Sequence, residues 1–197
     1  MQIITNNNKD VDTQQSKVFN DLEGYEWAEP AITKLHSAGI VNGTGNGNFE
    51  PERLVTREEF VKLMCEAFNV EESDMELTFS DVKADDWFYG YVSRAVNAKI
   101  VMGFSEDMFG TGANISREDM TVMLYRALKA TGKSMDNVQN EFNDKNMIAD
   151  YAKESVDTMT AHGIINGVGN NMFAPEKSAT RAEAAVVILR CIEEFAM

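Results

Sequence analysis

Apolar residues recur at intervals of three and four in six separate stretches of the chain, a pattern typical of amphipathic helices. Three of these stretches begin after an aromatic residue, and their apolar faces are Ala31, Ile32, Leu35 and Ala38; Val92, Ala95, Val96 and Ile100; and Val156, Met159 and Ile164. The other three follow Thr56, Ser116 and Thr180, with the apolar faces Phe60, Val61, Leu63, Met64, Ala67 and Phe68; Met120, Leu124 and Leu128; and Ala185, Ile188 and Leu189. Segments rich in Gly and Asn, such as 43–49 and 167–173, separate the two kinds of stretch and break any helix. We therefore expect an all-α protein built from three helix–loop–helix units.

The three units share one set of landmarks at fixed spacing. An aromatic residue is followed sixteen residues later by glycine, six later by phenylalanine and eight later by arginine. These landmarks are Trp27, Gly43, Phe49 and Arg57; Trp87, Gly103, Phe109 and Arg117; and Tyr151, Gly167, Phe173 and Arg181. Such spacing identifies an internal repeat. The expected organisation is a polar leader over residues 1–18 and units over 19–68, 79–128 and 142–194.

Charge and composition exclude several classes of function. The net charge of −14 opposes binding to nucleic acid or to an anionic membrane surface. No apolar run approaches the ~20 residues that span a bilayer, so we expect no membrane insertion. The opening residues contain no hydrophobic core of a secretory signal.

Chemical motifs are equally sparse. Cys65 and Cys191 lie in apolar helical stretches and are expected to be buried free thiols. With two histidines in addition, the chain offers no Cys/His zinc site, and we expect no metal and no cofactor. It has no catalytic Ser/His/Asp or Cys/His set and no phosphate loop. An enzyme is therefore the weakest interpretation.

The arginine that closes each repeat lies in a Thr/Ser-Arg-x-acid tetrad. Thr56 and Glu59 form a capping box, so we interpret the hydroxyl and the acid as structural. Arg57 stands at the first helical position, where the helix dipole disfavours a cation and free N–H groups can hold an anion. An arginine placed there three times is explained by an acidic partner or by a ligand carboxylate. The structural alternative is a salt bridge from each arginine to Asp21, Asp81 or Asp144, or to a similar acid.

The aromatic landmarks also have two interpretations. Trp27, Trp87 and Tyr151 could belong to the core, or each could offer a stacking face to a sugar ring. The glycines could serve turns, or they could allow a ligand to approach the backbone. The phenylalanines, Phe49, Phe109 and Phe173, are expected to be buried loop anchors.

Several strings of the first and third units together resemble the S-layer homology module, which commonly occurs as a tandem triplet. The first unit reads Ala-Gly-Ile-Val-Asn-Gly over 38–43, Phe-Glu-Pro over 49–51 and Thr-Arg-Glu-Glu over 56–59. The third reads His-Gly-Ile-Ile-Asn-Gly over 162–167, Phe-Ala-Pro over 173–175 and Thr-Arg-Ala-Glu over 180–183. The resemblance covers residues 19–194.

This resemblance implies a three-pronged, pseudo-threefold body with a central three-helix bundle. It implies an extracellular, monomeric module of a bacterial cell wall or S-layer, which binds secondary cell-wall polysaccharide through a pyruvylated sugar in grooves between modules. The implied carbohydrate-binding residues are Arg57, Arg117, Arg181, Trp27, Trp87, Tyr151, Asp21, Asp81, Asp144, Gly43, Gly103 and Gly167. The alternative is a helical protein–protein adaptor of the cell surface.

The second unit departs from the pattern most. Lys99 replaces the glycine found at 39 and 163, and the loop over 104–109 lacks the Gly/Asn pattern. In the third unit, Tyr151 replaces tryptophan. We therefore expect the grooves that contain Arg57 and Arg181 to be the most functional and the groove of the second unit to be altered.

Overall fold

The computed structural model describes residues 18–196, so the predicted leader lies outside the described residues apart from Val18. The helices are α1 (Glu29–Ser37), α2 (Arg57–Phe68), α3 (Tyr89–Asn97), α4 (Arg117–Ala130), α5 (Lys153–Ala161) and α6 (Arg181–Glu194), with one 3₁₀ turn, η1 (Lys145–Met147). The described residues contain isolated β-bridges but no strand. The all-α prediction is confirmed.

The helix boundaries follow from local chemistry. Thr56 and Thr180 each accept a hydrogen bond from the backbone N–H three residues on, and Glu59 and Glu183 complete the two capping boxes. Ser116 caps α4 in the same way, but the shorter Asp119 side chain does not accept a hydrogen bond from the Ser116 N–H, so the capping box is incomplete. After α3, Lys99 adopts a φ of 59°, the left-handed conformation that glycine supplies after α1 and α5. The departure at Lys99 is therefore accommodated, at a cost of about 1 kcal/mol.

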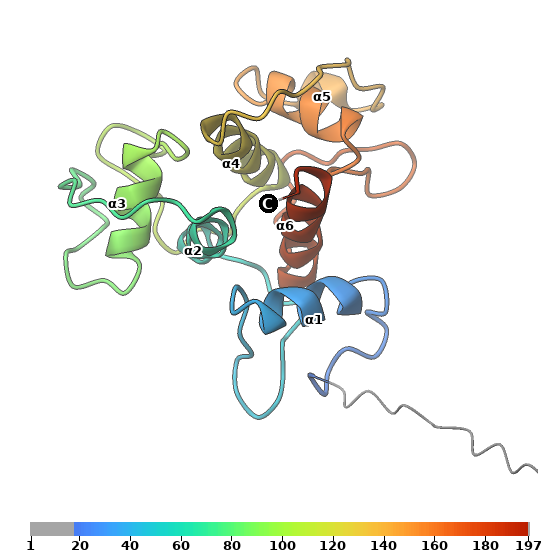
Figure 1. Cartoon of the computed structure of the whole chain (residues 1–197). Coiled ribbons are helices and arrows are strands. Elements are labelled where there is room, and N and C mark those ends of the chain that lie inside the picture. Colours follow the sequence, from blue (N-terminus) through green and yellow to red (C-terminus); the bar gives the residue numbers. More distant parts are fainter. Residues whose placement is uncertain (1–17, 197) are drawn as a thin grey trace, which may run out of the picture.

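The six helices pack as three central and three outer helices (Figure 1). Each of α2, α4 and α6 contacts the other two, which gives the expected central three-helix bundle. The outer helix α3 packs on α2, α5 packs on α4, and α1 packs on α6. Each outer helix therefore covers the central helix of a different unit, and the contact between α1 and α6 joins the first unit to the third. The pseudo-threefold symmetry itself stays a prediction, as do the unit boundaries.

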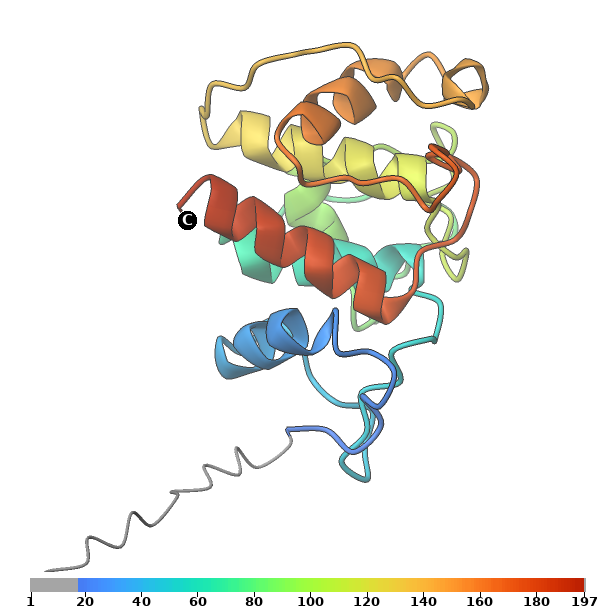
Figure 2. The ribbon, with the colours of Figure 1, turned by 90° about the vertical axis from the view of Figure 1, so that its right-hand side faces the viewer.

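A closed set of backbone hydrogen bonds joins the three units where the central helices begin. Val55 N–H donates to Ala179 O (3.0 Å), Ala179 N–H to Ile115 O (3.0 Å), and Ile115 N–H to Val55 O (2.9 Å). All three side chains are buried. The central helices run in the same direction from this ring, as Figure 2 shows. The ring therefore brings the three arginine-bearing helix starts together at one end of the molecule.

Candidate carbohydrate-binding grooves

Arg117 and Arg181 are the first residues of α4 and α6, and the backbone N–H groups at these helix starts are already hydrogen-bonded. Arg117 N–H donates to Lys177 O (2.9 Å), and Arg181 N–H donates to Arg53 O (2.9 Å). In α4 and α6 the second N–H donates to a proline carbonyl of another unit, and the third donates to the capping hydroxyl. The start of these two helices is therefore not a free anion site, and any role in ligand binding rests on side chains.

Two of the arginine side chains make the same contacts across a unit boundary. Arg117 donates from Nε to Phe173 O (2.9 Å) and from Nη2 to Asn166 O (2.8 Å). Arg181 donates likewise to Phe49 O and Asn42 O, both at 2.8 Å. In each case the guanidinium also lies over the ring of that phenylalanine. These arginines fix the loop of the neighbouring unit, a structural role that neither sequence-based alternative included.

Arg57 makes a different set of contacts. Nη2 donates to Met102 O (2.6 Å), Nη1 pairs with Asp119 Oδ2 (3.2 Å), and Nε is buried without a hydrogen-bond partner. The Arg57 guanidinium lies 4.8 Å from the centre of the Phe104 ring. Burial lowers the pKa of Arg57, and Asp119 acts in the opposite direction. Arg57 is therefore the one tetrad arginine with a salt bridge among the described residues, and its partner is none of the three aspartates named from the sequence.

The three predicted aspartates hold the loop of their own unit. Asp21 accepts from the N–H groups of Phe49 (2.8 Å) and Glu50 (2.7 Å). Asp81 and Asp144 accept from the equivalent N–H groups, and Asp81 also accepts from Thr111 N–H. The alternative of salt bridges from the arginines to these three aspartates is therefore wrong, because backbone N–H groups occupy the carboxylates. A salt bridge to a similar acid, which the same alternative included, is confirmed for Arg57 with Asp119.

The aromatic landmarks lie in the turns before the outer helices and are exposed. Trp27, Trp87 and Tyr151 have exposed fractions of 56%, 59% and 55%, which excludes the core interpretation. Phe49, Phe109 and Phe173 are buried as expected, as are the free thiols of Cys65 and Cys191. The exposed rings are therefore accessible to a ligand.

Each exposed aromatic lines a groove of its own, which we name after it. The Trp87 groove, about 290 Å³, is lined by Asn42, Gly43, Thr44, Arg53, Glu59, Lys62, Leu63, Trp87 and Arg181. The Trp27 groove, about 260 Å³, is lined by Trp27, Arg117, Ile165, Asn166, Gly167, Val168, Lys177, Glu183, Val186, Val187 and Arg190. The Tyr151 groove, about 360 Å³, is lined by Arg57, Met102, Gly103, Phe104, Asp119, Val122, Met123, Arg126 and Tyr151. Every groove thus takes its aromatic, its arginine and its glycine from three different units.

The landmark glycines are required by close backbone packing. A Cβ at Gly43 would lie 2.7 Å from Asn48 O and 2.8 Å from the Phe19 ring. Gly103 and Gly167 are similarly close to Met108 O and Met172 O. A side chain at any of these positions would displace the loop that forms the groove wall.

Because each groove combines residues of three units, the divergent loop of the second unit does not lie in the same groove as Arg117. The divergent loop of the second unit lines the groove of Arg57, whereas Arg117 lies with Trp27 and the Gly167 loop of the third unit. The expected ranking, with Arg57 and Arg181 in the most functional grooves, assigned an arginine and a loop of the same unit to one groove. The structure places them in different grooves, so the two grooves that resemble each other are those of Arg117 and Arg181.

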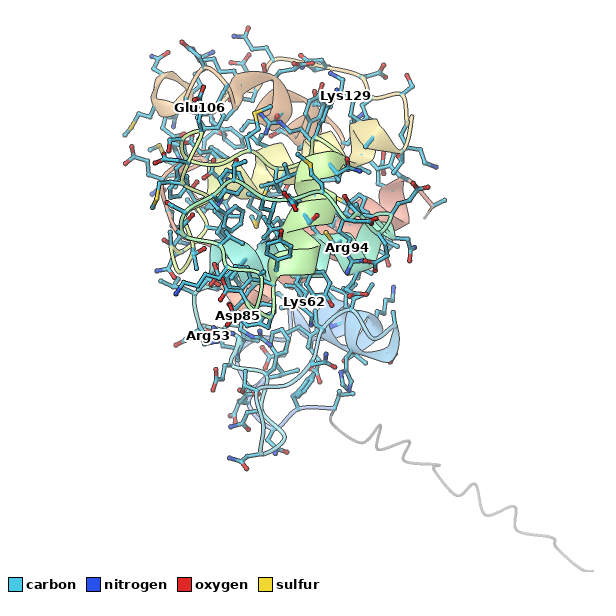
Figure 3. The ribbon with its side chains drawn as sticks, turned by 90° about the vertical axis from the view of Figure 1, so that its left-hand side faces the viewer. Arg53, Lys62, Asp85, Arg94, Glu106 and Lys129 are labelled. Atoms are coloured by element: carbon cyan, nitrogen blue, oxygen red, sulfur yellow. The ribbon has the colours of Figure 1, made fainter. Side chains whose placement is uncertain are left out.

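Two grooves gather basic side chains that the landmark spacing did not reveal. The Trp87 groove contains Arg53, Lys62 and Arg181 against the single acid Glu59 (Figure 3 labels Arg53 and Lys62). The Trp27 groove contains Arg117, Lys177 and Arg190 against Glu183. Arg53 pairs with Glu59 (2.8 Å) and Lys177 with Glu183 (2.7 Å), so one cation in each groove is neutralised locally. The remaining positive charge suits an anionic ligand in a chain of net charge −14.

A sequence signal for these residues existed. Arg53 and Lys177 stand four residues before the landmark arginines at 57 and 181, and the equivalent residue of the second unit is Ala113. Arg126 and Arg190 stand nine residues after Arg117 and Arg181. Extending the repeat alignment beyond the tetrad would have found them.

Other kinds of site receive no support from residues 18–196. Within this range no cluster of three or more His, Cys, Asp or Glu side chains could hold a metal ion. None of the helices described above has the length and hydrophobicity needed to cross a membrane.

Comparison with known proteins agrees with the repeat. Residues 18–61, 78–121 and 141–185 each match the S-layer homology domain. The chain is 37% identical over 92% of its length to the exoglucanase XynX of Acetivibrio thermocellus, and 31% identical over 89% of its length to the surface-layer 125 kDa protein of Lysinibacillus sphaericus. It is 26% identical over 79% of its length to a cellulosome-anchoring protein of Acetivibrio thermocellus. The chain spans 17%, 15% and 36% of these three relatives, so most of each relative lies outside the match.

Proposed function

The chain belongs to the S-layer homology domain family, and we propose that it is a noncovalent cell-wall anchor that binds secondary cell-wall polysaccharide. The expected location in the cell wall or S-layer of a bacterium agrees with its S-layer and cellulosome-anchoring relatives. We propose no catalysis by the chain itself, because the match covers only 17%, 10% and 18% of the length of three relatives with enzyme names.

The ligand that fits the Trp87 and Trp27 grooves best is an acidic sugar, such as one carrying a pyruvate ketal. Each groove offers one exposed indole, which can stack on the C–H face of a sugar ring. Each also offers three basic side chains against one acid. A carboxylate placed among these cations gains charge-assisted hydrogen bonds. The excess of cations beside an exposed indole is the observation that carries the proposal.

Within the Trp87 groove, Lys62 is the best candidate to contact a ligand carboxylate. The guanidinium of Arg181 is committed to two backbone carbonyls, and that of Arg53 to Glu59 and Glu50. Lys62 is half-buried in the groove wall. In the Trp27 groove, Arg190 holds the Ile164 carbonyl with Nη1 (3.1 Å) and is the corresponding candidate.

The test compares binding of the protein to purified wall sacculi before and after acid extraction of the secondary polymer. The variant Lys62→Glu/Arg190→Glu should lose at least about tenfold in affinity for intact sacculi, because repulsion replaces attraction in both grooves. The control Lys99→Glu/Lys129→Glu makes the same charge change at exposed positions outside the three grooves. Undiminished binding by the groove variant would exclude the proposed sites. Binding that survives extraction would indicate peptidoglycan, and no binding to any wall fraction would favour a protein–protein adaptor.

A further inference from the structure

The Tyr151 groove has the same construction as the other two but a different surface. Ala113 stands where the other grooves have Arg53 and Lys177. Its wall presents Met102, Val122 and Met123. Its charged side chains are Arg57, Arg126 and Asp119. The groove is therefore more apolar and less positive than the Trp87 and Trp27 grooves.

The landmark arginine of this groove, Arg57, is not available to a ligand carboxylate, which leaves Arg126 as the one lining cation outside the Arg57–Asp119 pair. Arg57 is 5% exposed, and it bonds Asp119 and Met102 O. Asp119 is in turn held by the hydroxyl of Tyr151, which donates to Oδ1 at 2.9 Å. A carboxylate that bound Arg57 would have to displace Asp119, and its attraction to Arg126 would be opposed by the negative charge of Asp119.

A second exposed ring lines this groove. Phe104 is 58% exposed, lines the groove together with Tyr151, and covers the guanidinium of Arg57. The equivalent residues of the other grooves are Thr44 and Val168. Gly110 makes this position possible, because a Cβ there would overlap the Phe104 ring at 2.5 to 2.8 Å. Glu50 and Ala174 occupy the equivalent positions in the other units, so the ring and its glycine occur together in the second unit alone.

We propose that the Tyr151 groove is a second kind of subsite, which binds an uncharged sugar ring with an apolar substituent such as an acetyl methyl group. Tyr151 and Phe104 offer stacking surfaces, and the side chains of Met102 and Met123 form an apolar wall for the substituent. This inference rests on the proposed function, since it assigns the groove to an uncharged residue of the same wall polymer. One polymer would then be bound through charge in the Trp27 and Trp87 grooves and through shape and apolar contact in the Tyr151 groove.

The sequence supplies separate reporters for the two kinds of groove. The only two tryptophans of the chain, Trp27 and Trp87, each line one basic groove. Met102 and Met123 line the Tyr151 groove, and the residues that line the other two grooves include no methionine. Indole fluorescence therefore follows the basic grooves, and the NMR signals of ¹³C-labelled methionine methyl groups follow the Tyr151 groove.

The test titrates the full chain with N-acetylglucosamine, with glucose, and with the 4,6-pyruvate ketal of methyl glucoside. Met102→Leu and Met123→Leu variants assign the two methyl signals. We expect N-acetylglucosamine to shift both signals with at least about tenfold higher affinity than glucose or the ketal, and the ketal to change the indole fluorescence. Phe104→Thr, which installs the residue of the Trp87 groove, should weaken N-acetylglucosamine binding about tenfold. Met108→Thr is the control, because Met108 is exposed on the same loop but does not line the groove.

Each other outcome is decisive. If the ketal shifts Met102 and Met123 as strongly as the neutral sugar does, the groove is a third acidic subsite and the inference is overturned while the proposed function stands. Unshifted methyl signals with every sugar also overturn it. If the ketal leaves the indole fluorescence unchanged, the proposed function fails independently of the Tyr151 groove.

Discussion

In the Trp87 groove the capping acid Glu59 bonds its own helix start and pairs with Arg53, which leaves Lys62 facing the groove. In the Tyr151 groove the equivalent acid, Asp119, pairs instead with the landmark arginine and with a tyrosine hydroxyl. The two grooves are lined by equivalent positions of the repeats, but the loops differ: Gly45, Asn46 and Gly47 have positive φ, and the equivalent Ser105, Glu106 and Asp107 do not. In the Trp87 groove the capping acid therefore leaves the landmark arginine Arg181 outside the ion pair, whereas in the Tyr151 groove it engages the landmark arginine and leaves Arg126 as the one lining cation outside the pair.

Two sequence differences account for this contrast. Ala113 removes the basic partner that Arg53 supplies, and Asp119 is one methylene shorter than Glu59 and does not close the capping box. Left without either partner, the carboxylate of Asp119 turns to Arg57. We therefore propose that two positions set the ligand preference of a groove: the capping acid and the residue four positions before the arginine of the tetrad, which lies outside the tetrad.

The strongest predicted effect concerns stability and should not distinguish the grooves. Arg181→Ala leaves the carbonyls of Phe49 and Asn42 without their donors and should lower the free energy of unfolding by about 2–4 kcal/mol. Arg57→Ala should cost a similar amount, because it leaves Asp119 without its cation and the Met102 carbonyl without its donor. Urea unfolding measures both. If either variant lost wall binding at unchanged stability, its arginine would be a direct ligand contact instead of a support for the neighbouring loop.

A smaller predicted effect, on the affinity for the pyruvate ketal sugar, should distinguish the Trp87 groove from the Tyr151 groove. Trp87→Ala removes the stacking face of a basic groove and should weaken binding of the pyruvate ketal sugar there about tenfold. Tyr151→Ala should leave the affinity for this sugar within about twofold, because we expect the sugar not to occupy that groove. Isothermal titration calorimetry checks both. A tenfold loss with Tyr151→Ala would mean that the two kinds of groove do not differ in ligand.

One groove can also be converted into the other. The triple variant Phe104→Thr/Ala113→Arg/Asp119→Glu gives the Tyr151 groove three residues of the Trp87 groove, those equivalent to Thr44, Arg53 and Glu59. It adds a cation and lengthens the capping acid, so the acid can pair as Glu59 does and release Arg57. We expect a gain of about fivefold in affinity for the ketal sugar, seen in the methyl signals of Met102 and Met123. Phe104→Thr alone serves as the matched control and should not produce the gain.

The weakest predicted effect concerns the loop that carries Phe104. Burial alone would raise the pKa of Asp81, but the N–H groups of Phe109, Thr111 and Gly110 outweigh it and hold the pKa below its usual value. A carboxyl group with a lowered pKa stabilises the fold above its unfolded pKa of about 3.9, and this contribution is lost as the pH falls through the folded value. Asp81→Asn should therefore cost at most about 1 kcal/mol at pH 7 and progressively less in acid. A cost that does not change with pH would contradict this role of the carboxylate.

The local part of the fold could be predicted from the sequence. Apolar periodicity and the capping residues Thr56, Ser116 and Thr180 act within one or two helical turns, so they placed the helices correctly. The packing of α1 on α6 could not be predicted from them. It depends on contacts between residues more than a hundred positions apart, which no local pattern records.

The candidate site was predicted in part for the same reason. The spacing found the arginines and aromatics, but it could not tell that Arg117, Trp27 and Gly167 share a groove. The helix starts suggested a free anion site, whereas carbonyls from neighbouring units fill those of α4 and α6. The sequence also could not show that Asp21 accepts a hydrogen bond from the Phe49 N–H and so holds the loop, because the two residues meet only in the folded chain.

A single titration can test both the sharing of grooves between units and the binding of an acidic wall sugar in the basic grooves. The pyruvate ketal sugar is added to Trp27→Phe and Trp87→Phe variants, each with and without Lys62→Glu, and the remaining indole is followed by fluorescence. Lys62 belongs to the same unit as Trp27 but lines the groove of Trp87. We predict that Lys62→Glu abolishes the response of Trp87 and leaves the response of Trp27 intact. Loss of the Trp27 response with retention of the Trp87 response, or no response from either indole, would contradict shared, acid-binding grooves.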